Sequence, residues 1–499
     1  MTILLHLIFF ILLKYFKCII VFPFKIATNS ILSSDSKYYD SHYFLRENFD
    51  TLIYTTIQIG SPPQEIKTLI SYNDCNFKIG KASKCIYTSE YLSFFNRNLS
   101  KTFNFTDYYP KPVAEFAGFK GHSAEDTISA YTDINLKNLE VFERIGFYLG
   151  SDTNEALCGI IGLRMQNYAT FCLESNTIFQ SFKSKGIIPN NKWMLNYTSK
   201  NEGLFIIGGE ISELIPNFKE DKLYKTYSAM GGSSFPWTLV IWKIECGINN
   251  ITINYEDVKA EINNDYSLIV GGFKYYSYIE NNFFNDYVKL NICTIDLANY
   301  VENFKYHVIV CDKENFGEKD IEKFPILSFV LRGFGEKFIF EGKDLFIETR
   351  YKYFFNIVFS NSISERWILG KTFFQKYPTM IDLTGKIIEI YNNNKEGKAN
   401  DNDQESGTRP EDNSNNDNQK KEKNKGDGKL STKFIVLMIV LILVLICIFS
   451  ALFYFIGKNI NKLRKRKANE LNDEYDYTSA ERDDSINNNN VAENNNIKD

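Results

Sequence analysis

Residues 45–394 consist of short apolar or alternating runs separated by glycine, asparagine and proline, and this pattern restricts the fold more than any other feature. The runs include LIYTTIQIG, LCGIIGL, GLFIIGGE, WTLVIWKIE, SLIVGG and KIIEIY. Many short strands at this spacing indicate an all-β fold. The 42 Phe and 31 Tyr residues also favour strands over helices. Two segments, 175–188 and 277–290, have the apolar spacing of short helices.

Both ends of the chain carry apolar segments. The first 22 residues, with the run Ile3–Leu13, predict a secretory signal peptide, and an uncleaved signal anchor is the alternative. Residues 434–457 contain no charge, and this length is sufficient for one transmembrane helix. Basic residues between Lys458 and Lys467 follow it, so the positive-inside rule predicts a cytoplasmic tail over 458–499.

These segments predict a single-pass type I membrane protein of the secretory pathway or cell surface. Residues 23–44 are expected to be a short pro-segment or linker. Residues 395–433 are almost entirely polar, so we expect a disordered stalk there. The net charge of -4 shows no basic excess and argues against a nucleic-acid partner.

Cysteines and glycosylation sequons are consistent with a secretory route. Cys18 lies in the signal segment and Cys447 in the membrane segment, and the other seven are Cys75, Cys85, Cys158, Cys172, Cys246, Cys293 and Cys311. Because seven is odd, at least one thiol is free or pairs between chains. Four Asn-x-Ser/Thr sequons predict glycosylation at Asn98, Asn104, Asn196 and Asn250.

Three motifs occur in order along the folded part. The first, TIQIGSPPQEIKTLIS, covers residues 56–71, the second, CGIIGL, covers 158–163, and the third, WILGKTFFQKYPTMIDLTGKIIEIY, covers 367–391. Each motif alone is weak evidence, but their order over some 340 residues is specific.

Together these motifs resemble the pepsin-like aspartic protease family. The resemblance implies a bilobed all-β fold, with lobes over 45–222 and 223–394 and a cleft between them for an extended peptide. It also implies disulfides Cys75–Cys85 and Cys293–Cys311, and assigns no partners to Cys158, Cys172 and Cys246. It implies no cofactor, and the four His show no metal-ligand spacing.

The chemistry of that family needs two facing carboxylates that share a proton, one acting as a base on water and the other as an acid. Each lobe supplies one Asp in a D-[TS]-G motif. In this sequence the first position falls at Ser71 and the second at Asn263, so both carboxylates are absent. A Ser hydroxyl is not a base near neutral pH without an activating group, and an Asn amide has no titratable proton.

Two nearby acids are the alternative. Asp74 and Asp265 lie three and two residues beyond the expected positions, and an insertion could bring either one into the pair. Neither begins a D-[TS]-G loop, so we interpret both as solvated loop acids.

The sequence therefore favours a membrane-anchored, non-catalytic homologue that binds a peptide or protein in the interlobe cleft or acts as a scaffold. An active aspartic endopeptidase with a non-standard pair and a structural or adhesion protein are the alternative hypotheses.

Overall fold

The structure is a computed structural model, and its described residues all belong to one compact unit, Met1–Asn402. The described ranges are 19–27, 39–72, 74–80, 95–106, 114–116, 119–150, 159–164, 177–229, 237–246, 251–301, 304–332, 337–360 and 366–393.

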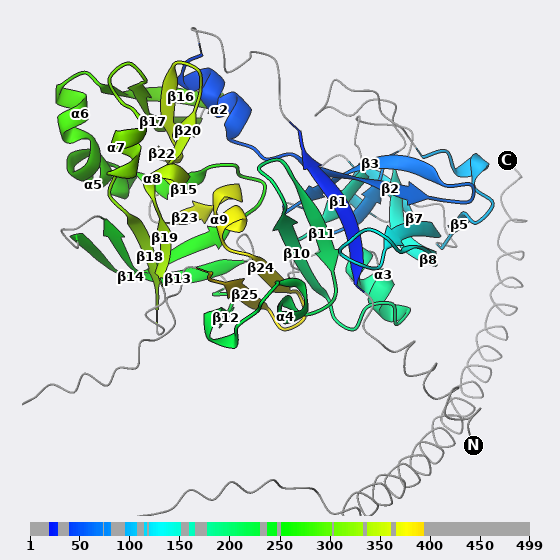
Figure 1. Cartoon of the computed structure of the whole chain (residues 1–499). Helices are drawn as coiled ribbons and strands as arrows, with labels where there is room; N and C mark the ends of the chain where they lie inside the picture. Colours follow the sequence, from blue (N-terminus) through cyan, green and yellow to red (C-terminus); the bar gives the residue numbers. More distant parts are fainter. Residues whose placement is uncertain are drawn as a thin grey trace, which may run out of the picture. The chain divides into compact units, whose positions relative to one another are not determined.

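The expectation of a mostly β architecture is confirmed, because the described residues form two large sheets (Figure 1). The first sheet has 14 strands in the described ranges. In chain order its strands are β1 (Ile20–Ile26), β2 (Ile53–Ile59), β3 (Gln64–Ser71), β4 (Phe77–Ile79), β5 (Asn104–Phe105), β6 (Ala114–Phe116), β7 (Phe119–Tyr131), β8 (Leu139–Gly150), β9 (Gly159–Gly162), β10 (Lys192–Tyr197), β11 (Glu202–Ile207), β12 (Leu223–Tyr227), β24 (Thr379–Asp382) and β25 (Ile387–Tyr391).

The second sheet has 11 strands in the described ranges, all from residues 238–369. They are β13 (Thr238–Cys246), β14 (Ile251–Ile262), β15 (Ile269–Gly272), β16 (Cys293–Val301), β17 (Phe304–Asp312), β18 (Leu327–Leu331), β19 (Lys337–Phe340), β20 (Phe346–Glu348), β21 (Lys352–Phe355), β22 (Ile357–Ser360) and β23 (Trp367–Leu369).

Helices in the described ranges are short and lie between strands. They are α2 (Ser41–Asn48), α3 (Ile178–Ser184), α4 (Ile211–Leu214), α5 (Tyr276–Ile279), α6 (Asn285–Lys289), α7 (Glu318–Glu322), α8 (Gly342–Leu345) and α9 (Lys371–Lys376), with the π-helix Glu280–Phe284 and the 3-10 helices Arg97–Leu99, Glu220–Lys222 and Phe273–Tyr275. The expected helical segment 175–188 contains α3, and the segment 277–290 overlaps the run from α5 to α6.

The folded part begins earlier than residue 45. Strand β1 pairs with β11 on one side and β2 on the other (Figure 1). Ile20, Val21 and Phe22 are each 2% exposed or less. A signal peptide that ends at residue 22 would cut strand β1 in two. The expected end of the signal peptide at residue 22 therefore needs correction. The run IVFPFKI continues the apolar N-terminal segment, which is why hydropathy alone did not separate the two.

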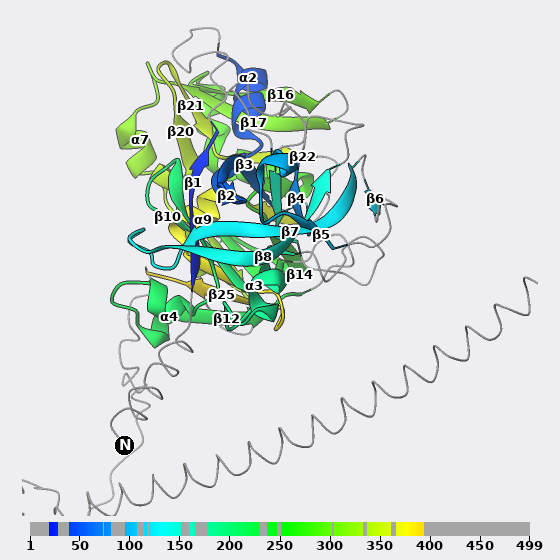
Figure 2. The same cartoon turned by 90° about the vertical axis from the view of Figure 1, so that its right-hand side faces the viewer.

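The expected linker 23–44 also contains part of helix α2, which packs on the second sheet beside β16 and β17 (Figure 2). Phe44 is fully buried, and its ring stacks on Phe354 with centroids 4.3 Å apart. The Ser41 hydroxyl donates to Asp296 at 2.6 Å. The chain thus passes from the first sheet to the second and back before β2 begins.

Three strands from the expected second lobe belong to the first sheet. β12 pairs with β25, β25 with β24, and β24 with β10. The expected lobe boundary between residues 222 and 223 therefore does not separate the two sheets, because the last two strands of the folded part belong to the first sheet.

No helix among the described residues is long and apolar enough to span a membrane. The segment 434–457 expected to do so lies outside the described residues, as do the stalk, the tail and residues 1–18.

Candidate functional site

The first loop of the candidate site follows strand β3, and a neighbouring glycine sets its position. β3 runs parallel to β9, with Ser71 beside Gly162. A Cβ atom on Gly162 would lie 2.5 Å from the carbonyl carbon of Asp74 and 2.5 Å from the backbone nitrogen of Cys75. Only glycine therefore allows the loop after Ser71 to pack this closely.

The second loop follows β14 and has the same construction. β14 runs parallel to β23 and ends one residue before Asn263. The backbone N–H of Asn263 donates to the carbonyl oxygen of Leu369 at 3.1 Å. A Cβ atom on Gly370 would lie 2.3 Å from the carbonyl oxygen of Tyr266. Ser71 and Asn263 thus occupy matching positions at the ends of two parallel strand pairs.

The two loops meet through the side chain of Asp265. Its Oδ2 accepts a hydrogen bond from the Ser71 hydroxyl at 3.0 Å. Its Oδ1 accepts from the backbone N–H of Tyr72 at 2.9 Å and from Nδ2 of Asn264 at 3.2 Å. Asp265 stands where the family pattern has a small glycine. A carboxylate therefore reaches the first loop from a position that carries no side chain in that pattern.

Asn263 lies between two acidic residues of its own strand and loop. Its Nδ2 donates to Oε1 of Glu261 at 3.0 Å, and its Oδ1 accepts from the backbone N–H of Asp265 at 3.0 Å. These two bonds fix the orientation of the amide, because only its nitrogen can donate to a carboxylate. Sequence reasoning did not single out Glu261, although residues two apart on a strand point to the same side.

Glu261 is almost fully buried, and burial has the largest effect on the pKa of its carboxyl group. Burial raises the pKa of its carboxyl group, and the Arg366 guanidinium, with Nη1 3.6 Å from Oε2, opposes that rise. Burial also raises the pKa of the Tyr72 phenol, and the negative charge of Glu261 adds to the effect. The Tyr72 oxygen accepts from the backbone N–H of Trp237 at 3.1 Å.

Asp74 is held within the first loop by local contacts. Its Oδ1 accepts from the backbone N–H groups of Cys75 and Asn76 at 2.8 and 2.9 Å. Its Oδ2 lies 2.6 Å from Nζ of Lys78, and the Asp74 side chain is 18% exposed. The interpretation of Asp74 and Asp265 as solvated loop acids is therefore wrong for both residues.

Residues 49–51, just before β2, form hydrogen bonds with the second loop. The backbone N–H of Thr51 donates to the carbonyl oxygen of Asp265 at 2.7 Å, and that of Ser267 donates to the carbonyl oxygen of Phe49 at 3.0 Å. The hydroxyls of Thr51 and Ser267 lie 2.6 Å apart. The backbone that carries Asp265 is thus fixed by hydrogen bonds on both of its sides.

Lys371 follows Gly370 and begins α9. Its backbone N–H donates to the carbonyl oxygen of Tyr266 at 2.7 Å. Burial lowers the pKa of its ammonium group to about 8, and the neighbouring positive charge of Lys200 adds to this. A lysine with a lowered pKa thus adjoins the second loop.

Two carboxyl groups lie at the meeting point of the loops, Asp265 bonded to Ser71 and Glu261 bonded to Asn263. The Asp265 carboxyl group accepts hydrogen bonds from the Ser71 hydroxyl, the Tyr72 backbone N–H and the Asn264 amide. The Ser71 hydroxyl donates a hydrogen bond to the Asp265 carboxyl group. Among the described residues, no group of His, Cys, Asp and Glu is arranged to hold a metal ion.

The disulfide Cys293–Cys311 is confirmed, and it joins β16 to β17. Cys75 is also disulfide-bonded. Its expected partner Cys85 lies outside the described residues, together with Cys158 and Cys172. Cys246 ends β13.

The predicted glycosylation sites differ in their surroundings. Asn98 and Asn104 are exposed, Asn196 is half-buried in β10, and Asn250 lies outside the described residues. Glycosylation at these sites stays a prediction.

Comparison with known proteins gives limited information. No family model matches the sequence, and no curated protein matches it. Among solved structures, the chain is similar to the crystal structure of basic 7S globulin from soybean, at 12% identity over 75% of this chain and 95% of that chain, with a TM-score of 0.49. Similarity at this level carries no argument about activity, ligands or partners.

Proposed function

We propose that this protein is a membrane-anchored, non-catalytic homologue of the pepsin-like aspartic proteases. It binds a polypeptide partner between its lobes or acts as a scaffold, at the cell surface or in the secretory pathway. The observation that carries the proposal is the direct contact between the two loops. The positions expected to hold the catalytic pair are Ser71 and Asn263, and the Asp265 carboxylate is hydrogen-bonded to Ser71.

An active aspartic endopeptidase is the second candidate, and Asp265 is the observation that favours it. This carboxylate reaches the first loop, as a catalytic acid would. However, its partner there is the Ser71 hydroxyl, which cannot act as the second titrating acid. The Asp74 carboxylate is engaged by Lys78 and by backbone N–H groups of its own loop.

The test is a cleavage assay of the purified full chain on mixed peptide libraries between about pH 3 and 7, the range in which a shared-proton pair titrates. A transition-state-analogue inhibitor of aspartic proteases identifies cleavage by this mechanism. We expect no inhibitor-sensitive cleavage. Cleavage that the inhibitor blocks would show that the chain is an enzyme.

Two variants provide matched controls for that assay. The double variant Ser71→Asp with Asn263→Asp restores both acids but leaves the Asp265 carboxylate between them. Because the side chain at position 263 contacts Glu261, four carboxyl groups then lie close together; their charges repel one another, and we expect no recovery. The triple variant adds Asp265→Gly and removes the Asp265 carboxylate. Activity in the triple variant alone would identify Asp265 as the group that blocks the site.

A further inference from the structure

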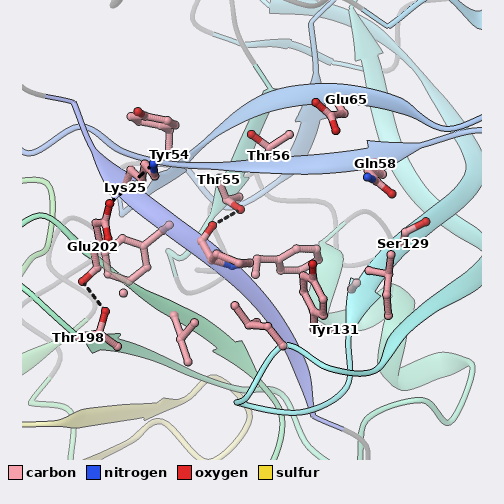
Figure 3. A pocket seen from close by; sticks show the side chains of 18 residues that line it. Lys25, Tyr54, Thr55, Thr56, Gln58, Glu65, Ser129, Tyr131, Thr198 and Glu202 are labelled. Atoms are coloured by element: carbon pink, nitrogen blue, oxygen red, sulfur yellow. Dashed lines mark hydrogen bonds and ion pairs between the residues drawn. The ribbon is translucent and has the colours of Figure 1, made fainter.

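The outer face of the first sheet contains a cavity that the proposed function does not use. Its volume is about 420 Å³, within the range of sites that hold small molecules or parts of larger ones. Strands β1, β2, β7 and β11 line it, together with the turn between β7 and β8 (Figure 3). Strand β1 lies between β2 and β11, and β7 pairs with both β1 and β2. The hydrogen bonds of the sheet therefore fix the walls of this cavity.

The walls of the cavity combine apolar and polar side chains. Pro23 on β1 lies beside Leu204 on β11, and Tyr54 and Tyr131 contribute aromatic rings. The polar side chains include Lys25, Thr56, Gln58, Glu65, Thr198 and Glu202. Figure 3 shows those of β2 and β3 on one side of β1, and Thr198 with Glu202 on the other. A ligand that suits these walls has C–H surface together with several hydroxyl or amide groups.

The ion pair between Lys25 and Glu202 lines this cavity and is open to water. Nζ of Lys25 lies 3.7 Å from Oε1 of Glu202, and the two side chains are 65% and 58% exposed. A pair this exposed is held weakly, so the ammonium can donate to a ligand and the carboxylate can accept from it. Sugar hydroxyls do both, while sugar C–H groups and an N-acetyl methyl group pack on apolar side chains. The lining therefore suits an N-acetylated sugar.

A glycosylation sequon lies beside the cavity on the same face of the sheet. The sequon is Asn196–Thr198, and Thr198 lines the cavity. Asn196 on β10 pairs with Leu204 on β11, which pairs with Pro23 on β1. Residues directly opposite each other in antiparallel strands point to the same face. With strands about 4.8 Å apart, the Asn196 side chain starts about 10 Å from Pro23, on the side of the sheet that carries the cavity.

Asn196 differs in its surroundings from the other sequon asparagines that the structure describes. Its side-chain amide forms no hydrogen bond within the described part of the chain, so its nitrogen is available for a sugar. Asn196 is half-buried, whereas Asn98 and Asn104 are exposed. Nδ2 of Asn104 donates to Oε1 of Glu125 at 3.3 Å. A glycan on Asn196 therefore begins against the sheet, and one on Asn104 begins at an exposed side chain.

We infer that the cavity holds the first N-acetylated sugars of an N-linked glycan on Asn196. Their C–H and methyl groups pack on Pro23 and Leu204, and their hydroxyls bond to the polar side chains around them. This inference rests on the secretory-pathway location in the proposed function, because N-linked glycans are attached there. It adds a structural role for the glycan, which covers this face of the first sheet.

The test measures how readily each glycan is released from the native chain. The full chain is produced in eukaryotic cells, purified in detergent and treated with peptide N-glycosidase, and mass spectrometry follows each sequon. We expect the glycan on Asn104 to be released from the native chain. The glycan on Asn196 should be retained until the chain is denatured.

A cavity-filling variant separates packing in the cavity from the position of Asn196 in a strand. Thr56 is exposed on β2, three strands from Asn196, so Thr56→Trp fills the cavity without changing β10. We expect this variant to release the Asn196 glycan at least about tenfold faster, which corresponds to about 1.4 kcal/mol of lost packing. The control Leu290→Trp, at a position 69% exposed and away from the cavity lining, should leave the rate unchanged.

The occupancy of the sequons separates this inference from the proposed function. Absence of glycan from all four sequons would contradict the secretory-pathway location and the inference together. Glycans at Asn98 and Asn104 with none at Asn196 would overturn the inference alone. Equal release from Asn196 and Asn104 in the native chain would also overturn it, as would an unchanged Asn196 release rate in Thr56→Trp.

Discussion

At the scale of single residues, the contact between the loops depends on a side chain where the family pattern has none. Asp265 accepts from Ser71 and from the backbone of Tyr72. The amide of Asn263 is oriented by Glu261 on one side and by the backbone of Asp265 on the other. The centre of the site is therefore a connected set of hydrogen bonds whose members fix one another.

The Ser71–Asp265 bond can be measured with a double-mutant cycle of Ser71→Ala and Asp265→Asn. Because the acceptor is a carboxylate, we expect a coupling free energy of about 1.5–3 kcal/mol. The measurement is chemical denaturation of the four proteins in the same detergent. Additive effects of the two substitutions would show that this bond does not hold the loops together.

At the scale of elements, the segment from β1 to β2 connects the two sheets. It begins in the first sheet as β1 and forms α2 on the second sheet. It then forms hydrogen bonds with the loop that carries Asp265 and returns to the first sheet as β2. Phe44 is the buried anchor of α2 and contacts the ring of Phe354. Much of the stability of the second sheet near β16 and β17 should therefore depend on this short helix.

Phe44→Ala tests the anchoring of α2. Removing a fully buried phenylalanine ring leaves a cavity, and we expect a loss of about 3–5 kcal/mol in the free energy of unfolding. Leu290→Ala is the control, because Leu290 is 69% exposed and should change stability by no more than about 0.5 kcal/mol. Similar small losses in both variants would show that α2 is not packed as described.

At the scale of the whole molecule, buried acids make stability depend on pH. The pKa of Glu261 is raised by burial, so its favourable contribution is present below its unfolded value and is lost as pH rises through the raised pKa. The pKa of Glu245 is lowered, although burial opposes this, because Lys243 and Lys337 donate hydrogen bonds to it. Its contribution is present above the unfolded value and is lost as pH falls through the lowered pKa.

Glu261→Gln and Glu245→Gln should therefore change stability in opposite directions at neutral pH. We expect Glu261→Gln to be more stable than the natural chain at pH 7, with the difference vanishing in acid. Glu245→Gln should be less stable at pH 7, and its difference should also vanish in acid. Thermal unfolding measured at several pH values checks both predictions. If the stability difference between Glu261→Gln and the natural chain did not depend on pH, the raised pKa of Glu261 would be contradicted.

The motifs predicted much of the fold and part of the site. GIIGL and WILGK contain the two glycines against which the loops pack, and the counts from the motifs lead to Ser71 and Asn263. The direction of the Asp265 side chain could not be predicted, because it depends on how the second loop meets the first. Strand β1 was not predicted, because its residues are as apolar as the run before it.

The placement of β1 has a consequence for the order of events during synthesis. Its partners are residues 53–55 and 202–207, so β1 leaves the ribosome long before β11 exists to pair with it. The same sheet also needs β24 and β25, which end at Tyr391. Strands that are this distant in sequence pair late and slowly during folding. Strand β1 must therefore remain unpaired along the edge that β11 covers until residue 207 has been made, about halfway through the folded part.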